Sequence, residues 1–156
     1  MLRDHGRREK YLHEISGWNE RLDSMQAAIL SAKFDFLDHW NQKRVKHAER
    51  YIELLKNCNQ IQLPQSNPVS SHVYNQFVIQ CDRRDDLHKF LIGQGIQAGI
   101  QFPLAMHQQP VYRSIATVNL PNSERLAARC ISLPVHAQLN PEDVDVVAQA
   151  VLDFFN

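Results

Sequence analysis

The most regular pattern of hydrophobic and polar positions lies between residues 22 and 57. Apolar residues recur there three or four positions apart, which is typical of one face of an α-helix. Asp23 is a good N-cap, and no Pro or Gly follows before Asn57 or Asn59, either of which can end a helix. The pattern therefore predicts one long helix over residues 23–57. Its apolar positions are Leu22, Met25, Ile29, Ala32, Phe36 and Trp40 and, after a slip in phase, Val45, Ala48, Ile52 and Leu55.

This helix is long for the chain that contains it. At about 1.5 Å per residue, residues 24–57 span roughly 50 Å, whereas a compact protein of 156 residues has a diameter of roughly 40 Å. Leu30, Phe34 and Leu37 add a second apolar row, although a surface helix needs only one. We therefore expect the helix to kink near Asn41 or to pack against a second domain or subunit. The alternative is a helix at the centre of its own core.

The rest of the chain alternates between strand and helix patterns. Asp85 and Asn140 are candidate N-caps, and Gly95 is placed to end the first of the shorter helices. Helices packed against one face of a sheet would give a small α/β two-layer sandwich over residues 58–156. The predicted order is a polar connector at 59–71, a strand at 72–81, a helix at 85–91, a strand at 96–102, a loop at 103–112, a helix at 121–130, an edge strand at 131–135 and a helix at 140–155.

The first residues carry charge without periodicity. Residues 1–16 interleave basic and acidic side chains and fit neither an amphipathic helix nor a strand, so we expect residues 1–22 to be the end of another domain. A basic arm that binds nucleic acid is a weaker hypothesis, because only Tyr11 could stack on a base.

Composition excludes several classes of protein. Seventeen basic and seventeen acidic residues balance, so we expect neither nucleic acid nor a membrane surface as a partner. No apolar run reaches the length of a membrane span, and the start lacks the apolar segment of a signal peptide. Cys58, Cys81 and Cys130 are few, odd in number and far apart, which suits the cytoplasm rather than a disulfide framework. No histidine cluster has metal-ligand spacing, and no phosphate loop or nucleophile elbow is present.

A family resemblance goes further than these patterns. One stretch closely resembles a segment of the DegT/DnrJ/EryC1/StrS sugar aminotransferases, namely RDHGRREKYLHEISGWNERLDSMQAAIL. The members of this family depend on pyridoxal phosphate and share the aspartate-aminotransferase fold. The later motifs HVYNQFVIQ, RRDDL, FPLAMHQQPVY and LPNSERLAARCISLP follow in the family's order. The resemblance implies the C-terminal part of such an enzyme, with the end of the cofactor domain, a connecting helix and the small domain.

The resemblance also implies site residues. The Asn of the GxNxR motif, here Asn19, would reach the cofactor phosphate of the neighbouring subunit, and Arg21 would bind cofactor or substrate or else pair with an acid. His107 and Tyr112 would line the nucleotide-sugar side. The family's Schiff-base lysine would lie upstream, and none of the six lysines here matches its context. The common His-Tyr pair before the loop is replaced by Gln101–Phe102, which leaves the substrate open.

Two functions remain as hypotheses. The first is a fragment of a nucleotide-sugar aminotransferase that transfers an amino group from glutamate to a keto-sugar nucleotide. By itself it would be inactive and bind no cofactor, and it would form a homodimer or higher oligomer through the long helix. The alternative is a non-catalytic dimerising or ligand-binding module derived from that family.

Overall fold

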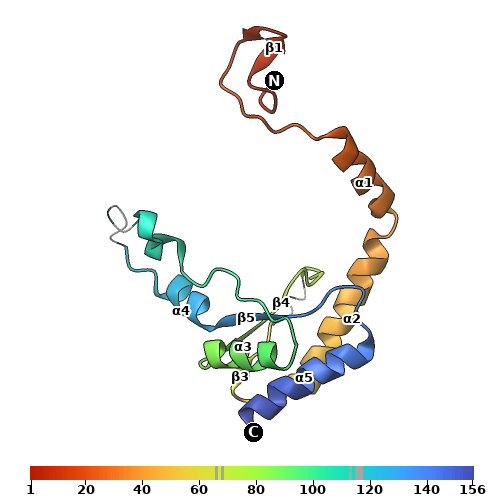
Figure 1. Cartoon of the computed structure of the whole chain (residues 1–156), viewed down its shortest axis with the longest axis vertical. Coiled ribbons are helices and arrows are strands. Elements are labelled where there is room, and N and C mark those ends of the chain that lie inside the picture. The colour runs from red at the N-terminus through yellow and green to blue at the C-terminus, as the bar shows by residue number, and fades with distance from the viewer. Residues whose placement is uncertain (66, 68, 113, 115–117) are drawn as a thin grey trace. The chain divides into compact units, whose positions relative to one another are not determined.

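The computed structural model describes residues 1–65, 67, 69–112, 114 and 118–156. The chain divides into two units, Met1–Asp38 and His39–Asn156, and each is described by itself (Figure 1). The division falls two residues inside helix α2 (Leu37–Leu55), within the segment for which one long helix is predicted.

A short hairpin forms the start of the N-terminal unit. Strand β1 (Arg7–Glu9) pairs antiparallel with β2 (Leu12–His13), so the prediction that residues 1–16 form no strand is wrong. The two strands pair without an alternation of hydrophobic and polar residues. Backbone hydrogen bonds between the segments that flank the hairpin, residues 1–6 and 14–20, hold them together. The His5 N–H donates to the Trp18 carbonyl at 2.7 Å, one of several such bonds.

Two glycines allow this hairpin to close. Gly6 has a φ of 69°, in the left-handed region that side chains disfavour. A Cβ on Gly17 would lie only 2.1 Å from the backbone nitrogen of Gly6, and a Cβ on Gly6 would lie 1.6 Å from the carbonyl oxygen of Ile15. The backbones therefore approach so closely that neither position has room for a side chain.

The predicted long helix is two helices. Helix α1 (Ser24–Phe34) begins where the sequence indicates, since the Asp23 carboxylate accepts the Met25 N–H at 2.8 Å. A turn at residues 35–36 then separates it from α2 (Leu37–Leu55), so the uninterrupted helix is wrong and the break precedes the expected kink near Asn41. The Phe36 N–H donates to the Lys33 carbonyl, three residues back, at 3.1 Å, which tightens the last turn of α1 into 3₁₀ form.

No residue of α1 is buried. Phe34 is 71% exposed, and the side chains at Met25, Ile29 and Leu30 are more than half exposed. The alternative of a helix at the centre of its own core is therefore wrong for α1, although α2 does bury Ala48, Tyr51 and Leu55 in the larger unit.

An antiparallel sheet with the strand order β3-β4-β5 lies in the larger unit. Strand β3 (Ile61–Gln62) falls in the predicted polar connector, where it was not expected and where residues 66 and 68 lie outside the described residues. Strand β4 (Phe77–Cys81) is shorter than predicted because Tyr74 turns the chain with a φ of 47°. Strand β5 (Cys130–Leu133) matches the predicted apolar segment, beginning one residue earlier.

The strand predicted over residues 96–102 is wrong. Only Gly99 pairs, in an isolated antiparallel bridge to Ser132 of β5. Ile96 and Ala98 are buried, as the alternation suggests, but Phe102 has a φ of 56° and is 79% exposed. Ile96 and Ala98 are therefore buried although the segment does not form a regular strand.

Local signals place most of the remaining helices. Helix α3 (Arg84–Gly93) has Arg83 at its N-cap, so the prediction that Asp85 caps it is wrong, because Asp85 lies in the first turn. The stop at Gly95 is confirmed by its φ of 78° and by the Ile96 N–H donating to the Leu91 carbonyl. The other elements are two 3₁₀ turns, η1 (Met106–Gln108) and η2 (Pro110–Tyr112), and helices α4 (Pro121–Arg129) and α5 (Pro141–Phe155).

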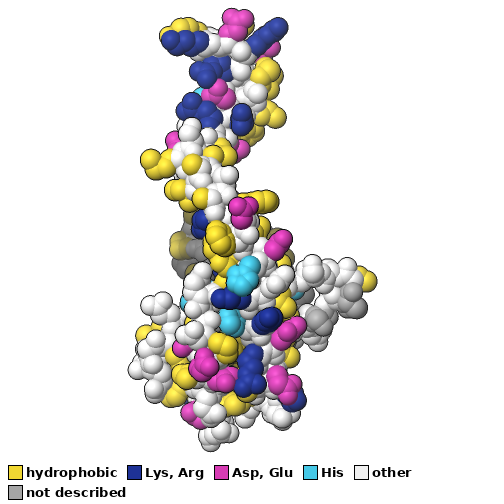
Figure 2. Space-filling model, turned by 90° about the vertical axis from the view of Figure 1, so that its right-hand side faces the viewer, with side chains coloured by type: hydrophobic (Ala, Val, Ile, Leu, Met, Phe, Trp, Pro, Cys, Tyr) yellow, Lys and Arg dark blue, Asp and Glu magenta, His cyan; other side chains and the backbone are white. Residues whose placement is uncertain are grey.

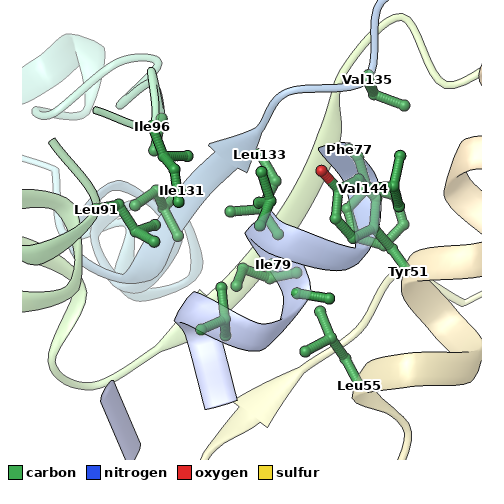
Figure 3. Packing of buried hydrophobic residues seen from close by; sticks show 14 of the residues in the cluster. Tyr51, Leu55, Phe77, Ile79, Leu91, Ile96, Ile131, Leu133, Val135 and Val144 are labelled. Atoms are coloured by element: carbon green, nitrogen blue, oxygen red, sulfur yellow. The ribbon is translucent and has the colours of Figure 1, made fainter. Parts of the chain in front are cut away.

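The hydrophobic core fills one face of the sheet. Phe77 and Ile79 of β4 point toward helices α2, α3 and α5, and Figure 3 shows Tyr51, Phe77 and Val144 gathered there. The Tyr51 ring stacks on Phe77 with centroids 4.9 Å apart, and its hydroxyl donates to the Pro134 carbonyl at 2.9 Å. Burial of each such apolar side chain contributes about 1.5–3 kcal/mol. The predicted α/β fold class is confirmed.

A buried guanidinium joins α4 to the sheet. Helix α4 passes directly into β5 with no intervening residue. The Arg84 side chain is buried, and its Nη1 donates to the carbonyls of Ala127 at 2.9 Å and Cys130 at 3.1 Å. The positive charge therefore satisfies carbonyl groups where the helix ends, as the helix dipole favours.

Candidate functional site

The two residues of the GxNxR motif lie side by side in the N-terminal unit. Asn19 and Arg21 line a polar hollow of about 460 Å³ together with Leu22, Asp23 and Ser24 at the start of α1. The Arg21 Nε donates to the Asn19 Oδ1 at 3.2 Å. The amide oxygen of Asn19 is thus bonded. Its amide nitrogen has no hydrogen-bond acceptor in the described part of the chain and can donate to a ligand.

The hairpin holds Asn19 in place. Asp4 and Asn19 form an antiparallel bridge, and the Glu20 N–H donates to the Arg3 carbonyl at 2.8 Å. The His13 Nδ1–H donates to the His5 carbonyl at 2.9 Å, so His13 stabilises the same loop. Backbone pairing with residues 3 and 4 thus fixes the position of the GxNxR motif, and the charge pattern of the N-terminal residues did not predict this pairing.

Charges around Asp4 order the guanidinium groups beside it. The Arg7 Nη2 lies 2.5 Å from one Asp4 oxygen, and the Arg21 Nε lies 3.8 Å from the other. Desolvation raises the pKa of Asp4, but the hydrogen bond and charge of Arg7, with the charge of Arg21, outweigh it and hold the pKa below its usual value. Arg21 therefore pairs with an acid while also lining the hollow.

His107 and Tyr112 are brought together in a second, larger cleft in the C-terminal unit. This cleft has a volume of about 780 Å³ and lies over the sheet face opposite the core, where Val78 and Ser132 form its floor. The loop from Gln101 to Tyr112 and helix α4 form its walls, and most of the lining is apolar. Such a shape, with a few polar groups, is typical of a site for an organic ligand.

His107, one of the polar residues that line this cleft, pairs with Glu124 of α4, which is not itself part of the lining. The His107 Nε2 lies 2.8 Å from the Glu124 Oε1, which also accepts the Leu120 N–H at 3.2 Å. The hydrogen bond from His107, followed by that from Leu120, lowers the pKa of Glu124 below its usual value. The carboxylate is thus kept ionised and fixes the imidazole. The His107 Nδ1 is buried, with no hydrogen-bond partner in the described residues.

Glu124 is the partner of a cleft residue that sequence reasoning missed. It lies within the LPNSERLAAR motif and in the first turn of α4, where an acid reads simply as a helix-dipole residue. Only the fold of the 3₁₀ turns brings His107, seventeen positions earlier, against it.

Lysines are absent from both hollows. No described lysine lines the cleft or the Asn19 hollow. Lys10 lies over the ring of Tyr11, 5.2 Å from its centroid, and Lys56 pairs with Glu53 at 2.6 Å. In the Asn19 hollow an amide and a guanidinium can donate to a phosphate group, and the Asp23 carboxylate, which also lines it, is bonded to the first N–H groups of α1. Among the described residues, neither hollow offers a lysine amine for a covalent bond to a cofactor.

Comparison with known proteins decides the family. The profile of the DegT/DnrJ/EryC1/StrS aminotransferase family matches residues 1–152. The chain belongs to this family. Among the described residues of this family member, no helix is both long and apolar enough to cross a membrane, and no three metal-binding side chains come together.

Curated relatives from several bacteria are similar in sequence. A pleiotropic regulatory protein of Geobacillus stearothermophilus is 38% identical over 99% of this chain and 43% of its own length. The dTDP-3-amino-3,4,6-trideoxy-α-D-glucose transaminase of Streptomyces venezuelae is 36% identical over 99% of this chain and 41% of its own. The chain thus spans about two fifths of the length of these relatives.

Solved structures confirm the aminotransferase fold. The S. venezuelae DesV structure, described as a complex with a ketimine intermediate, has a TM-score of 0.94 and 35% identity, covering 100% of this chain and 43% of that one. A DegT/DnrJ/EryC1/StrS aminotransferase from Brucella abortus has a TM-score of 0.87 and 30% identity, covering 99% and 42%. The fold of the chain therefore corresponds to a part of these enzymes.

Proposed function

We propose that this chain is the C-terminal part of a pyridoxal-phosphate-dependent nucleotide-sugar aminotransferase. In the complete enzyme, an amino group would move from glutamate to a keto-sugar nucleotide. Family membership and the transaminase names of the relatives support this proposal. The observation that carries it is the pairing of Asn19 and Arg21 at one polar hollow beside a helix start.

Asn19 would hold the cofactor phosphate of the neighbouring subunit. The Arg21 guanidinium orients the amide by binding its oxygen at 3.2 Å, so that the amide nitrogen donates to the phosphate. Arg21 would add a positive charge, because its ion-pair partner Asp4 is shared with Arg7. The cofactor, when bound, supplies the electron sink for amino transfer, and these residues bind and orient it.

The His107 cleft would receive the nucleotide sugar. Its apolar lining suits the rings of the substrate, while the imidazole and Tyr112 are among the lining groups able to hydrogen-bond phosphate or sugar hydroxyls. Glu124 would keep the imidazole oriented, and the unpartnered Nδ1 of His107 would complete its bonding with a ligand or a water.

The exposed helix α1 would be covered in a homodimer of the complete enzyme. Thirteen large hydrophobic side chains of residues 1–37 are exposed, and α1 buries none of its residues. Apolar surface of this extent favours a second surface. Sedimentation of the complete enzyme should show a dimer or higher oligomer, and a strictly monomeric species would contradict this part of the proposal.

The main test restores the missing part from a relative. A hybrid would keep the S. venezuelae transaminase but replace the 41% that this chain matches with the chain itself. We expect the hybrid to retain pyridoxal phosphate and to transaminate, and Asn19→Ala to weaken cofactor retention at least tenfold. The matched control is Asn67→Ala, in a loop of the other unit. Equal retention by both variants would contradict the role of Asn19.

A second test addresses inactivity of the chain alone. Incubation with pyridoxal phosphate and borohydride should leave every lysine unmodified at stoichiometric cofactor, as judged by mass spectrometry. A stoichiometric adduct on a single lysine would overturn the proposal that the attachment lysine lies elsewhere and would favour catalysis by this chain itself.

A further inference from the structure

A third hollow lies on the helical layer of the larger unit, away from the His107 cleft. It has a volume of about 390 Å³ and is lined by α2 and by residues 139–141 at the start of α5. These helices pack on the core face of the sheet, whereas the cleft lies over the opposite face. The side chains from α2 that line it are His39, Gln42, Lys43, Lys46, His47 and Arg50.

The lining carries unbalanced positive charge. Arg50 is neutralised by Asp145, with Nε–Oδ1 and Nη2–Oδ2 distances of 2.7 and 3.1 Å. Lys43 and Lys46 stand one helical turn apart, both are exposed, and neither forms an ion pair within the described part of the chain. Figure 2 shows histidine and basic side chains gathered on one face of the larger unit. No acidic residue lines the hollow among those described.

The start of α5 reinforces this charge. Asn140 and Pro141 line the hollow, and the fifteen-residue α5 directs the positive end of its dipole toward it. The Asp143 carboxylate binds the Asn140 N–H at 2.9 Å and offsets part of the dipole. The helix end alone would therefore be a weak attraction.

His47 is the independent sign of a ligand. Its side chain lines the hollow, yet the residue is only 6% exposed, and its Nε2 is buried without a hydrogen-bond partner among the described residues. A buried ring nitrogen left unbonded costs free energy. Desolvation, with the nearby charges of Lys43 and His136, lowers the pKa of His47 below its usual value. An anion in the hollow would offset that repulsion and supply an acceptor for the protonated ring.

We propose that this hollow binds a phosphate-type oxyanion through Lys43, Lys46 and His47. The two ammonium groups attract the anion, and the imidazolium formed when His47 is protonated adds a third positive charge beside them. The site is separate from the aminotransferase function proposed above and does not depend on it. Free phosphate and the phosphate of a small organic ester share this chemistry.

The test follows the His47 ring in the whole chain by NMR. Sodium phosphate, pyrophosphate and glycerol phosphate are added at pH 7, each against sodium chloride of equal ionic strength. We expect a saturable shift of the His47 signals with phosphate and not with chloride, and tighter binding of the ester than of phosphate if a phosphorylated metabolite is the natural ligand. Equal or weaker binding of the ester would assign the site to free phosphate.

Substitutions separate this site from general charge attraction. The double variant Lys43→Ala/Lys46→Ala should weaken phosphate binding at least tenfold, and its fold should persist because both side chains are exposed. The matched control is Lys56→Ala, a basic residue just after the end of α2 that pairs with Glu53 outside the hollow. An unchanged affinity in the double variant, or an equal loss in the control, would overturn the proposal.

The titration of the ring provides the last readout. Bound phosphate should raise the pKa of His47, because the anion stabilises the imidazolium. A His47 pKa that is the same with and without saturating phosphate would contradict ligation by the ring. The charged groups that line the hollow or act on His47 include His39, Lys43, Lys46 and Arg50 of α2 and His136 before α5. On α5, Asp145 pairs with Arg50 and Asp143 accepts the Asn140 N–H.

Discussion

The two units of this chain reach order by different means. In His39–Asn156, helices bury one face of a sheet, and Tyr51, Phe77 and Ile79 are fully buried. In Met1–Asp38, hydrogen bonds between backbone segments close a hairpin, while residues such as Trp18 and Phe34 stay more than half exposed. The larger unit therefore supplies its own hydrophobic stabilisation, whereas the smaller one leaves much of its apolar surface exposed.

This difference bears on the two candidate sites. The His107 cleft stands on a sheet that its own core supports, so its geometry depends on the larger unit alone. The Asn19 hollow stands on glycine-dependent backbone pairing with little burial around it. We therefore expect substitutions to separate the two sites.

The largest expected effect is Phe77→Ala. Loss of a fully buried ring that stacks on Tyr51 should lower the free energy of unfolding by about 3–5 kcal/mol. Phe34→Ala removes the same kind of side chain from the exposed α1 and should change the free energy of unfolding by less than about 0.5 kcal/mol. Urea unfolding followed by circular dichroism measures both. Equal losses would show that α1 is packed in solution.

Gly17→Ala should open the hairpin. The new Cβ would meet the Gly6 nitrogen at 2.1 Å, so the local structure should lose more than about 1 kcal/mol. Amide hydrogen exchange at Trp18 and Glu20 should then accelerate. The control is Gly93→Ala, because nothing lies within 4 Å of a Cβ there and the helix end should tolerate it. Unchanged exchange in Gly17→Ala would refute the close approach.

Tyr51→Phe should cost about 1 kcal/mol of unfolding free energy, because it removes the hydroxyl that donates to the Pro134 carbonyl and keeps the stacked ring. Burial raises the pKa of this hydroxyl well above its usual value, so it should also fail to ionise at alkaline pH. The absorbance of tyrosinate in the folded chain at pH 11 should be short by one residue relative to the unfolded chain.

The smallest effect concerns Glu124 and acid. Its folded pKa lies below the usual 4.5, so its stabilising contribution is complete above about pH 4.5 and is lost as the pH falls through the lower folded value. Glu124→Gln should therefore flatten part of the loss of stability between pH 5 and 3. Denaturant midpoints at each pH measure this. An identical acid profile in the variant would show that the His107 contact contributes nothing.

Sequence patterns predicted the parts of the fold that depend on local signals. The N-cap at Asp23, the stop at Gly95 and the start of α5 at Pro141 follow from residue preferences within one turn. Tertiary contacts decided the rest. Ile96–Phe102 alternates as a strand does, yet only Gly99 finds a partner, because β5 offers one free backbone pair at Ser132.

The candidate sites divide in the same way. His107 and Tyr112 were predicted from the family motif in which they stand, and the structure does bring them together in one cleft. Glu124 could not be predicted, because its contact depends on two 3₁₀ turns that place His107 against α4. The basic hollow on α2 was likewise hidden, since the spacing of Lys43, Lys46 and Arg50 on a helix is that of an ordinary solvated face.

The hydrogen bonds from Arg84 to the end of α4 limit how the wall of the cleft that α4 forms can move. A helix that runs straight into a strand, with its last carbonyls held by a buried cation, cannot swing as a lid. We therefore expect differences in the shape of the cleft to arise in the opposite wall, the segment from Gln101 to Tyr112, rather than in α4. Exchanging residues of that segment should alter which ligands fit while the frame that carries Glu124 stays the same.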